Sequence, residues 1–579
     1  MKQSVFNLNT LKAHPERNAF DLTHNDVFSC APGMLLPIST TEVLPNEHFE
    51  INPQVFLRTM PLNSAAFVRM RQHIEFFFVP MRVLCRQFLQ FVVGTNYPIS
   101  SLDILNEFES KLPSISLDNI RESLEGYTSS DGLGIPLNNG MLRLFDLLGY
   151  GFNSSRKIDA KNYPSSYSSG SLTQSSPHLS LLRFGCYQKI YQDFYRNPYW
   201  EPANAYAFNF DDIFGSSLTY KADAGRLLDI ITLRYRNWTK DFYTCVQPQF
   251  QGAPFVTNSV DMANYMIAPD SKKGNNFIPG TSSVSYNSSI PQKTSSNVAV
   301  LNVSGGATMN IPIHNIRAAF ALDKLYRLQQ QAGNGSYGEQ IRNRFGFGGV
   351  HDDWKAQYLG GSSAPISIGE VITTANTQSS ADSPLGQTGD IYGKASSVND
   401  AKITFDVQEH GIIMGIFSVT PDADYNSNGI DPHNFKLSFE QFFQPEFDRL
   451  GHQPLNLYYL SSVKPLSGSE AGSESWLQRV IGFQNRYLEY KTGVDKVHGQ
   501  FCSGGSLSAW SAPRNSGLLL DSKGAPFFNY YSLKVSPKIL NSICSVTFDG
   551  TDKTDPILVD SHISIKAIRP MSVSDEPLL

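Results

Sequence analysis

The sequence has little charge of either sign. Charged residues make up 17% of its 579 positions, below the roughly one quarter that is usual for soluble domains. The 47 basic and 52 acidic residues give a net charge of -5. This balance excludes a polycation, so binding of nucleic acid would need a local basic patch. With 41% hydrophobic and 12% aromatic residues, the composition fits a chain whose surface is largely covered by other chains, and a large all-β enzyme would look similar.

Cysteine is scarce and widely spaced. The six cysteines, at positions 30, 85, 186, 245, 502 and 544, include no pair with the spacing of a redox motif or a zinc site. We therefore expect reduced cysteines and assembly in the cytosol. The first residues lack the apolar core and cleavage site of a signal peptide. No apolar run approaches the roughly 18 residues that span a bilayer, so we expect no membrane insertion.

Sequence motifs of catalysis and cofactor binding are also missing. The sequence contains no G-x-x-x-x-G-K-[ST], G-x-S-x-G or H-E-x-x-H, and no G-x-G-x-x-G after a predicted strand. The adjacent acids at 211–212 and 352–353 are interpreted as turn or cap residues. Asp422 and Asp424 could ligate a divalent ion, but a solvated turn is the favoured interpretation. We expect no catalytic residues, no cofactor and no metal site.

Apolar alternation typical of buried strands is abundant instead. In "EFFFVP", Phe76 and Phe78 share one face with Ile74, whereas Phe77 and Val79 lie on the other. Each fully buried Phe contributes about 1.5–3 kcal/mol, provided that something covers it. We expect the Ile74 face to lie in a core between two sheets. The face with Phe77 should be covered by an inserted helix or a neighbouring subunit.

Further strands and several helices are predicted by periodicity. Alternation predicts strands in "FEINPQVFLRTMPL", "HGIIMGIFSVTP" and "HISIKAIRP". Apolar stripes of helical period occur at residues 83–93, 182–198, 314–333 and 336–346. The second of these helices must end before Pro198. Together the patterns indicate a mainly β chain, either a two-sheet sandwich or a jelly roll, with long inserted loops and several helices.

Long tracts rich in Ser, Gly, Asn and Thr interrupt these elements, at residues 153–178, 254–308, 376–400 and 466–475. Loops of such length in a compact domain are usually functional or disordered. The 254–308 tract contains a short alternating run, so we expect it to be a folded surface excursion. The tracts at 376–400 and 466–475 are expected to be surface loops.

One stretch, "LRYRNWTKDFYTC", mixes basic and aromatic residues. Arg234, Arg236, Trp238 and Lys240 are candidates for contact with single-stranded DNA, because aromatic rings can stack on bases while cations bind phosphates. The alternative is that the rings pack in the core and the cations pair with acids. We favour the alternative, since stacking needs exposed rings.

At these segments the sequence resembles the major capsid proteins of the Microviridae, the small icosahedral single-stranded DNA phages, and in particular the gokushovirus-like and gut-associated branch. The resemblance rests on segments that follow in the family's order from about residue 18 to 571. They are "EFFFVPMRVL", "QFLQF", "IYQDFYRNP", "LRYRNWTKDFYT", "NIRAAFALDKL", "YGEQIRNRFG", "YLGGSSAPISIGEV", "EHGIIMGIFSV", "PEFDRLGHQPL", "VIGFQNRYLEYK" and "RPM".

The resemblance implies an eight-stranded viral jelly roll that fills residues 1–579 as one domain, with an N-terminal arm at 1–25 and inserted loops at 96–180. It implies sixty copies in a T=1 shell around circular single-stranded DNA, assembled in the bacterial cytoplasm and found in the virion. The 254–308 tract would form a surface protrusion that contributes to host attachment.

The resemblance also implies several partners. They are further copies of the chain, the DNA genome, a small basic DNA-packaging protein, a pilot or minor virion protein, and a host surface receptor. Two other functions compete with the capsid hypothesis. A β-sandwich that binds glycans or attaches to cells would form a small oligomer, and a β-sandwich glycosidase would depend on two convergent acids.

Overall fold

The computed structural model describes most of the chain, with gaps. The described residues are 16–86, 112–151, 177–202, 217–248, 354–372, 391–448, 451–461, 480–514, 528–550 and 554–573, with a few single residues and strand fragments between them. Contacts divide the chain into two compact units. Met1–Gln247 and His351–Leu579 form the first, and Pro248–Val350 form the second.

A large antiparallel β-sheet forms the framework of the first unit. Its strands follow the order β1-β24-β4-β15-β14-β5-β17-β3, with β2 also paired to β24 and β16 to β4. The strands are β1 (Asn18–Asp21), β2 (His24–Cys30), β3 (Leu36–Val43), β4 (His48–Thr59), β5 (Met70–Pro80), β14 (Gln357–Ile372), β15 (Ile391–Asp400), β16 (Ile403–Asp406), β17 (Gly411–Pro421) and β24 (Ile557–Arg569).

Strand β14 joins two halves of this sheet. Its first part, Gln357–Ile366, pairs with β5, and its second part, Ser367–Ile372, pairs with β15. The register shifts between Tyr358 and Gly360, where the glycine has a φ of 143°, a conformation that favours glycine. Such a bulge bends a strand and increases its twist. The sheet therefore curls into the β-sandwich or jelly-roll class, and the expected fold class is confirmed.

The main core lies between the two halves of the curled sheet. The rings of Phe28 on β2 and Phe417 on β17 meet edge to face with their centroids 5.6 Å apart. Phe78 on β5 meets Phe405 on β16 at 5.1 Å. Every residue of β17 is buried, as expected for a central strand with cover on both sides. The predicted core face of β5 is therefore correct.

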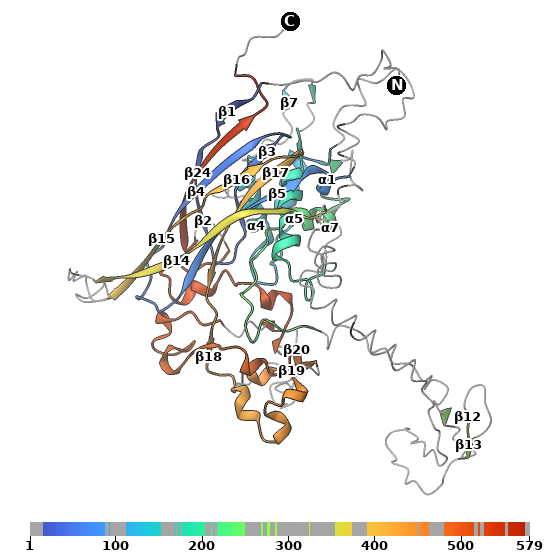
Figure 1. Ribbon diagram of the computed structural model, residues 1–579, viewed down its shortest axis with the longest axis vertical. Coiled ribbons are helices and arrows are strands. Elements are labelled where there is room, and N and C mark those ends of the chain that lie inside the picture. The colour runs from blue at the N-terminus through green and yellow to red at the C-terminus, as the bar shows by residue number, and fades with distance from the viewer. Residues whose placement is uncertain are drawn as a thin grey trace. The chain divides into compact units, whose positions relative to one another are not determined.

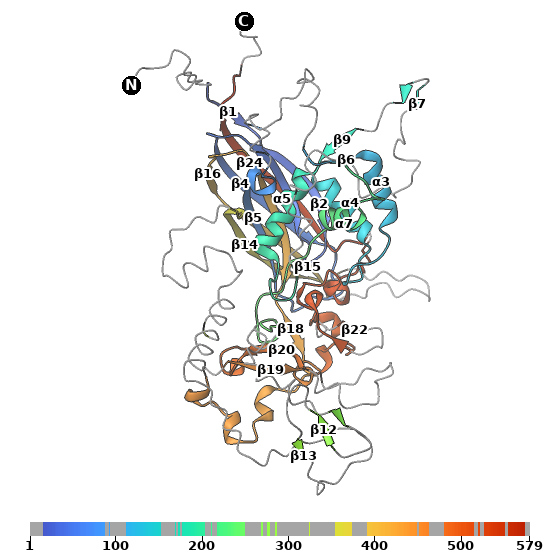
Figure 2. The same cartoon turned by 90° about the vertical axis from the view of Figure 1, so that its right-hand side faces the viewer.

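A layer of helices covers the other face of β5. The layer contains α1 (Met81–Leu84), α3 (Leu117–Gly126), α4 (Leu137–Leu147), α5 (Leu182–Ile190), the π-helical turn η2 (Tyr191–Tyr195) and α7 (Ala224–Ile231). Figures 1 and 2 show α4, α5 and α7 beside β3, β17 and β5, on the side away from β24 and β4. Phe77 packs on Phe194 with ring centroids 4.8 Å apart. Within the chain itself, a helix therefore supplies the second cover that the sequence required.

A smaller apolar cluster lies apart from the main core. It contains Phe242, Tyr243, Val246, Tyr425, Leu455, Leu460 and Leu488. The elements around it are β18 (Asp424–Asn426), β19 (His452–Asn456), β20 (Val480–Asn485), β21 (Asp495–Val497) and short 3-10 turns, among them η6 (Pro432–Phe435), η7 (Phe439–Gln441), η8 (Pro445–Phe447), η9 (Leu457–Tyr459), η11 (Leu488–Tyr490), η12 (Gly499–Phe501) and η13 (Ser508–Trp510).

The remaining described elements are short. In the first unit they are β6 (Ser114–Ser116), β7 (Ser168–Ser169), β8 (Leu172–Thr173), β9 (His178–Ser180), β10 (Ser217–Leu218), β22 (Leu519–Leu520), β23 (Pro526–Phe527), η14 (Tyr530–Leu533) and η15 (Ile539–Ser542). In the second unit, β11 (Ala268–Pro269), β12 (Asn275–Phe277) and β13 (Val284–Ser285) pair only with one another.

The structure corrects several expected boundaries. Part of the expected loop 376–400 is strand β15, whose buried face carries small or polar residues rather than large apolar ones. The expected loops 96–180 contain helices α3 and α4, and the expected arm 1–25 contains β1, which pairs with β24. These corrections concern local structure, because the sequence patterns there are weak.

The expectation of a single domain has to take account of the second unit. Residues 248–350 form this unit, which is distinguished from the jelly roll by the pattern of contacts within the chain. The expected excursion 254–308 falls within this unit, where the structure describes only the fragments β11, β12 and β13. The expected loop 466–475 lies outside the described residues, as do nearly all of the predicted helices 314–333 and 336–346. The predicted helix 182–198 is confirmed as α5 and η2, and it ends before Pro198.

Candidate assembly surface and the Arg234–Lys240 segment

Residues 234–238 of the Arg234–Lys240 segment run through the interior of the first unit, and residues 239 and 240 are exposed. Its backbone is hydrogen-bonded on both sides, to a turn that precedes β3 and to the chain after η14. The bonds are Leu35 N to Arg234 O at 3.1 Å, Arg236 N to Gly33 O at 2.7 Å, Trp238 N to Leu533 O at 2.9 Å, and Val535 N to Arg236 O at 2.9 Å. The segment therefore ties three distant parts of the chain together.

Arg236 forms an ion pair with Glu75 of β5. Its Nη1 lies 2.7 Å from Glu75 Oε2, and both side chains are about one fifth exposed. The same nitrogen donates to Ser418 Oγ of β17 at 2.9 Å. Tyr195 donates its hydroxyl to Glu75 Oε2, and the Arg236 guanidinium lies over the Tyr195 ring. The carboxylate and the guanidinium thus satisfy one another beneath the helical layer.

Arg234 is also engaged inside the fold. Its Nε donates to Gln188 Oε1 at 2.8 Å, and its Nη2 donates to the Asp229 carbonyl at 3.0 Å. The guanidinium lies over the ring of Tyr191. These contacts join α5 to α7, and they engage two of the five N–H donors of the guanidinium inside the fold.

Trp238 is buried, with 6% of its surface exposed, and the guanidinium of Arg514 lies over its ring at 5.2 Å. Stacking on a base needs an exposed ring face, which this ring lacks. Lys240 is exposed. Of the four candidate DNA contacts, Lys240 is the most exposed and Arg234 and Arg236 are partly buried, so a contact with DNA through Lys240 stays a prediction.

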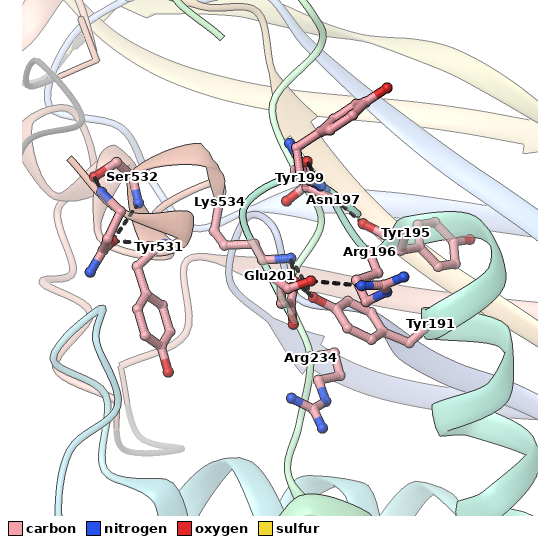
Figure 3. A network of polar contacts seen from close by, with 12 residues as sticks. Tyr191, Tyr195, Arg196, Asn197, Tyr199, Glu201, Arg234, Tyr531, Ser532 and Lys534 are labelled. Carbon is pink, nitrogen blue, oxygen red and sulfur yellow. Dashed lines mark hydrogen bonds and ion pairs between the residues drawn. The ribbon is translucent and has the colours of Figure 1, made fainter. Parts of the chain in front are cut away.

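A second polar network lies next to this segment (Figure 3). Lys534 Nζ lies 3.1 Å from Glu201 Oε2 and also donates to the Tyr191 hydroxyl. Tyr191 in turn donates to Glu201 at 2.6 Å, and Arg196 donates to the Glu201 carbonyl. Burial lowers the pKa of Lys534 to about 8, and Glu201 partly opposes that shift. The network fastens the chain after η14 to η2.

An exposed apolar surface is the feature that sequence reasoning missed. Leu437, Phe439, Phe442 and Phe443 are 90%, 78%, 50% and 44% exposed; we call them the 437–443 patch. The sequence did contain a signal for this patch, because four large apolar side chains fall within seven positions without the alternation that is typical of a strand. Large exposed apolar groups that lie together usually mark an interaction site.

The 437–443 patch is held in place by its polar backbone contacts. Gln441 Oε1 accepts hydrogen bonds from the backbone nitrogens of Leu437 and Ser438, at 2.6 and 3.0 Å. The Tyr487 hydroxyl donates to the carbonyl of Phe442 at 3.2 Å. Because the backbone is fixed while the side chains stay exposed, binding through them would cost little ordering entropy.

A second exposed apolar group lies at one end of the β14–β15 pair. Val371, Ile372, Ile391 and Tyr392 are 48%, 57%, 39% and 38% exposed, and Ile372 pairs with Ile391. Because four apolar side chains are exposed to water at this end of the strand pair, it is a second candidate for a contact with another chain.

The other candidates from the sequence hold no site among the described residues. Asp422 and Asp424 gather with Asp495 around Arg69, which lies 2.5 Å from Asp495. In the described part of the chain no group of three His, Cys, Asp or Glu could hold a metal ion. No described helix is long and apolar enough to cross a bilayer. The acids at 211–212 and 352–353 lie outside the described residues. All six cysteines are free.

Comparison with known proteins gives one consistent result. A family model described as capsid protein (F protein) matches residues 9–116 and 155–579. The capsid protein VP1 of Chlamydia phage 1 is 23% identical over 644 aligned residues, which cover 97% of this chain and 95% of the relative. The capsid protein VP1 of Bdellovibrio phage phiMH2K is 22% identical over 502 residues, with 82% and 81% covered.

The Arg236–Glu75 pair yields a first prediction. Replacing Arg236 by Met should lower the free energy of unfolding by about 2–4 kcal/mol, because Glu75 would remain beneath the helices without its cation. Lys240→Met is the matched control and should change it by less than about 0.5 kcal/mol. Urea unfolding of the unassembled chain measures both. A stable Arg236→Met variant that forms shells in full yield but without DNA would instead assign Arg236 to the genome.

His73 of β5 yields a prediction of pH dependence. Burial, followed by the nearby Arg236, lowers its pKa from 6.5 to about 4, while Glu75 opposes the shift. The unfolded chain therefore binds more protons than the folded chain between these values. Stability that is present above pH 6.5 should fall by about 2–3 kcal/mol as the pH drops to about 4.

His73→Gln should remove this part of the pH dependence, measured by urea unfolding between neutral pH and about pH 4. Thr420 Oγ1 lies 2.8 Å from the imidazole, and glutamine can keep a hydrogen bond to it. His562→Gln, at an exposed position on β24, controls for the loss of one histidine. An unchanged pH dependence in His73→Gln would contradict the prediction.

Proposed function

This chain belongs to the capsid protein (F protein) family of the Microviridae, and from that premise we propose that sixty copies build a T=1 icosahedral shell around a circular single-stranded DNA genome. The chain is a structural protein of the virion. The proposal for contacts between subunits rests on the 437–443 patch, which is apolar, exposed and fixed in conformation. Catalysis has no part in this function.

We propose that the 437–443 patch is a contact between subunits. Burial of one Phe side chain contributes about 1.5–3 kcal/mol, and aromatic side chains that fill a partner's pocket often carry most of an interface's energy. In a closed shell each subunit repeats the same contacts. A weak apolar contact repeated around the shell therefore suffices to stabilise the whole particle.

The charge of the chain bears on one further partner, a small basic protein, and the resemblance to the capsid family implies another. A net charge of -5 does not neutralise a genome, since each nucleotide carries a phosphate. We propose that a small basic packaging protein supplies the missing positive charge, and that a pilot or minor protein completes the virion. Lys240 is the candidate of this chain for a direct contact with DNA.

We propose that residues 254–308 contribute to host attachment, through a receptor on the host surface. Support comes from the second unit, to which these residues belong. Its described strands pair only with one another and add nothing to the sheet of the jelly roll. An insertion that is independent of the framework is free to vary with the receptor.

The patch proposal predicts an assembly defect without a folding defect. The double variant Phe439→Ser/Phe442→Ser should unfold in urea as the parent does, because both rings are exposed. Its shells should be absent or strongly reduced in negative-stain electron microscopy of the chain expressed with a small basic partner. Assembly should fall because the rings lose their apolar burial between subunits.

Val398→Ser is the matched control, since Val398 is 66% exposed and belongs to neither of the two exposed apolar groups. It should leave shell yield near that of the parent. Normal shells from the Phe439→Ser/Phe442→Ser variant would contradict the role of the patch. Small oligomers from the parent chain under the same conditions would favour the glycan-binding alternative.

The attachment proposal predicts a different phenotype. Deleting residues 254–308 should spare shell assembly but reduce adsorption of the particles to host cells, because the described strands of this segment do not pair with the large sheet. Electron microscopy measures the first effect, and depletion of free particles by cells measures the second. Loss of assembly on deletion would place the segment between subunits instead.

A further inference from the structure

A cavity of about 620 Å³ opens beside η14 and η15 in the first unit. Residues 132–134, Trp238, the segment 503–514 and the segment 531–542 contribute to its wall. The lining residues include six serines and the cations Arg514, Lys534 and Lys538, and none of the described lining residues is Asp or Glu. Cavities of this size hold ligands of nucleotide dimensions.

Arg514 is the unusual group of this wall. Its side chain is only 4% exposed, yet no described carboxylate lies within ion-pair distance of it. Its Nη1 donates to the Tyr425 hydroxyl at 2.9 Å and its Nη2 to the Ser532 carbonyl, while its Nε has no partner among the described residues. A buried cation without a counter-ion is costly, so an anion at this place would be stabilised.

The nearest acid does not serve as that counter-ion. Asp241 is reached only through Tyr425, whose hydroxyl donates to Asp241 Oδ2 at 2.6 Å. Asp241 also accepts the backbone N–H groups of Tyr243 and Thr244. Asp241 is thus held by donors from its own segment and from Tyr425, and it makes no direct ion pair with the guanidinium of Arg514 among the described contacts.

Lys538 adds a second positive charge at the wall. Its ammonium donates to the Gly134 carbonyl at 2.9 Å and has further protons to give. Burial raises the pKa of Asp131, and the N–H groups of Leu133 and Ile135, which this acid accepts, and nearby Lys538 partly oppose that shift. The ammonium of Lys534, by contrast, is neutralised by Glu201.

We propose that this cavity binds a phosphate group of a nucleotide-sized ligand, with Arg514 and Lys538 opposite the phosphate and serine hydroxyls as further donors. Guanidinium and ammonium groups make short, charge-assisted hydrogen bonds to phosphate. The phosphate has two conceivable sources, a free nucleotide or one unit of a single DNA strand. The site is separate from the 437–443 patch, and binding does not depend on shell assembly.

Titration calorimetry of the unassembled full chain at low salt tests the proposal. Deoxythymidine monophosphate should bind with one molecule per chain, inorganic phosphate more weakly, and deoxythymidine without phosphate not measurably. Lys538→Glu should weaken the binding by at least about tenfold. Lys394→Glu, which changes an exposed lysine of β15 outside the cavity wall, should leave it unchanged.

Two further arms keep the test decisive. Arg514→Gln should abolish binding, and urea unfolding shows whether that variant is folded; if it is not, Lys538→Glu, at a less buried position, carries the test. An oligothymidylate of about twelve nucleotides that binds when the monophosphate does not, and that Lys538→Glu weakens, identifies the strand as the source. Binding of neither probe up to millimolar concentration, or binding that Lys538→Glu leaves unchanged, would overturn the proposal.

Discussion

The architecture depends on one constraint, which is that residues 76–79 of β5 are apolar on both faces of the strand. Phe76 and Phe78 on one face and Phe77 on the other are all nearly inaccessible to water. A strand with this pattern must be covered twice. The curled sheet supplies the first cover and the helical layer around α5 and η2 supplies the second. Because the chain completes both covers itself, subunit contacts fall to other surfaces.

The second cover brings ionised groups beneath the helical layer, where each of them is paired with an opposite charge. Glu75 meets Arg236, and Glu201 meets Lys534. Arg143 of α4 and Asp555 near the start of β24 lie 2.7 Å apart and are almost fully buried. Such pairs contribute little net stability, but loss of one partner is costly. They therefore fix which segments meet, and this explains why the basic residues of the Arg234–Lys240 segment serve packing.

The sequence predicted those features that large apolar side chains encode. The faces of β5, the buried strand β17 and the end of the α5–η2 helix before Pro198 follow from alternation, apolar continuity and the missing proline N–H. Strand β15 could not be predicted in this way, because its buried face consists of Gly393, Ala395, Ser397 and Asn399. Those positions are specified by contacts with partners distant in sequence, such as the hydrogen bond between Asn399 and Ser362, which local patterns do not contain.

Exposure of aromatic rings distinguishes the surfaces that are available to other chains from the surfaces that this chain covers itself. Most aromatic rings of the Arg234–Lys240 region are buried although cations surround them, whereas the rings of Phe439 and Phe442 are exposed although their backbone is firmly held. Exposed apolar area is costly in water for an isolated subunit, and it carries few charges that would oppose association. A sequence with only 17% charged residues therefore suits a protein whose final environment is other copies of itself, because the cost of exposure is recovered when the shell closes.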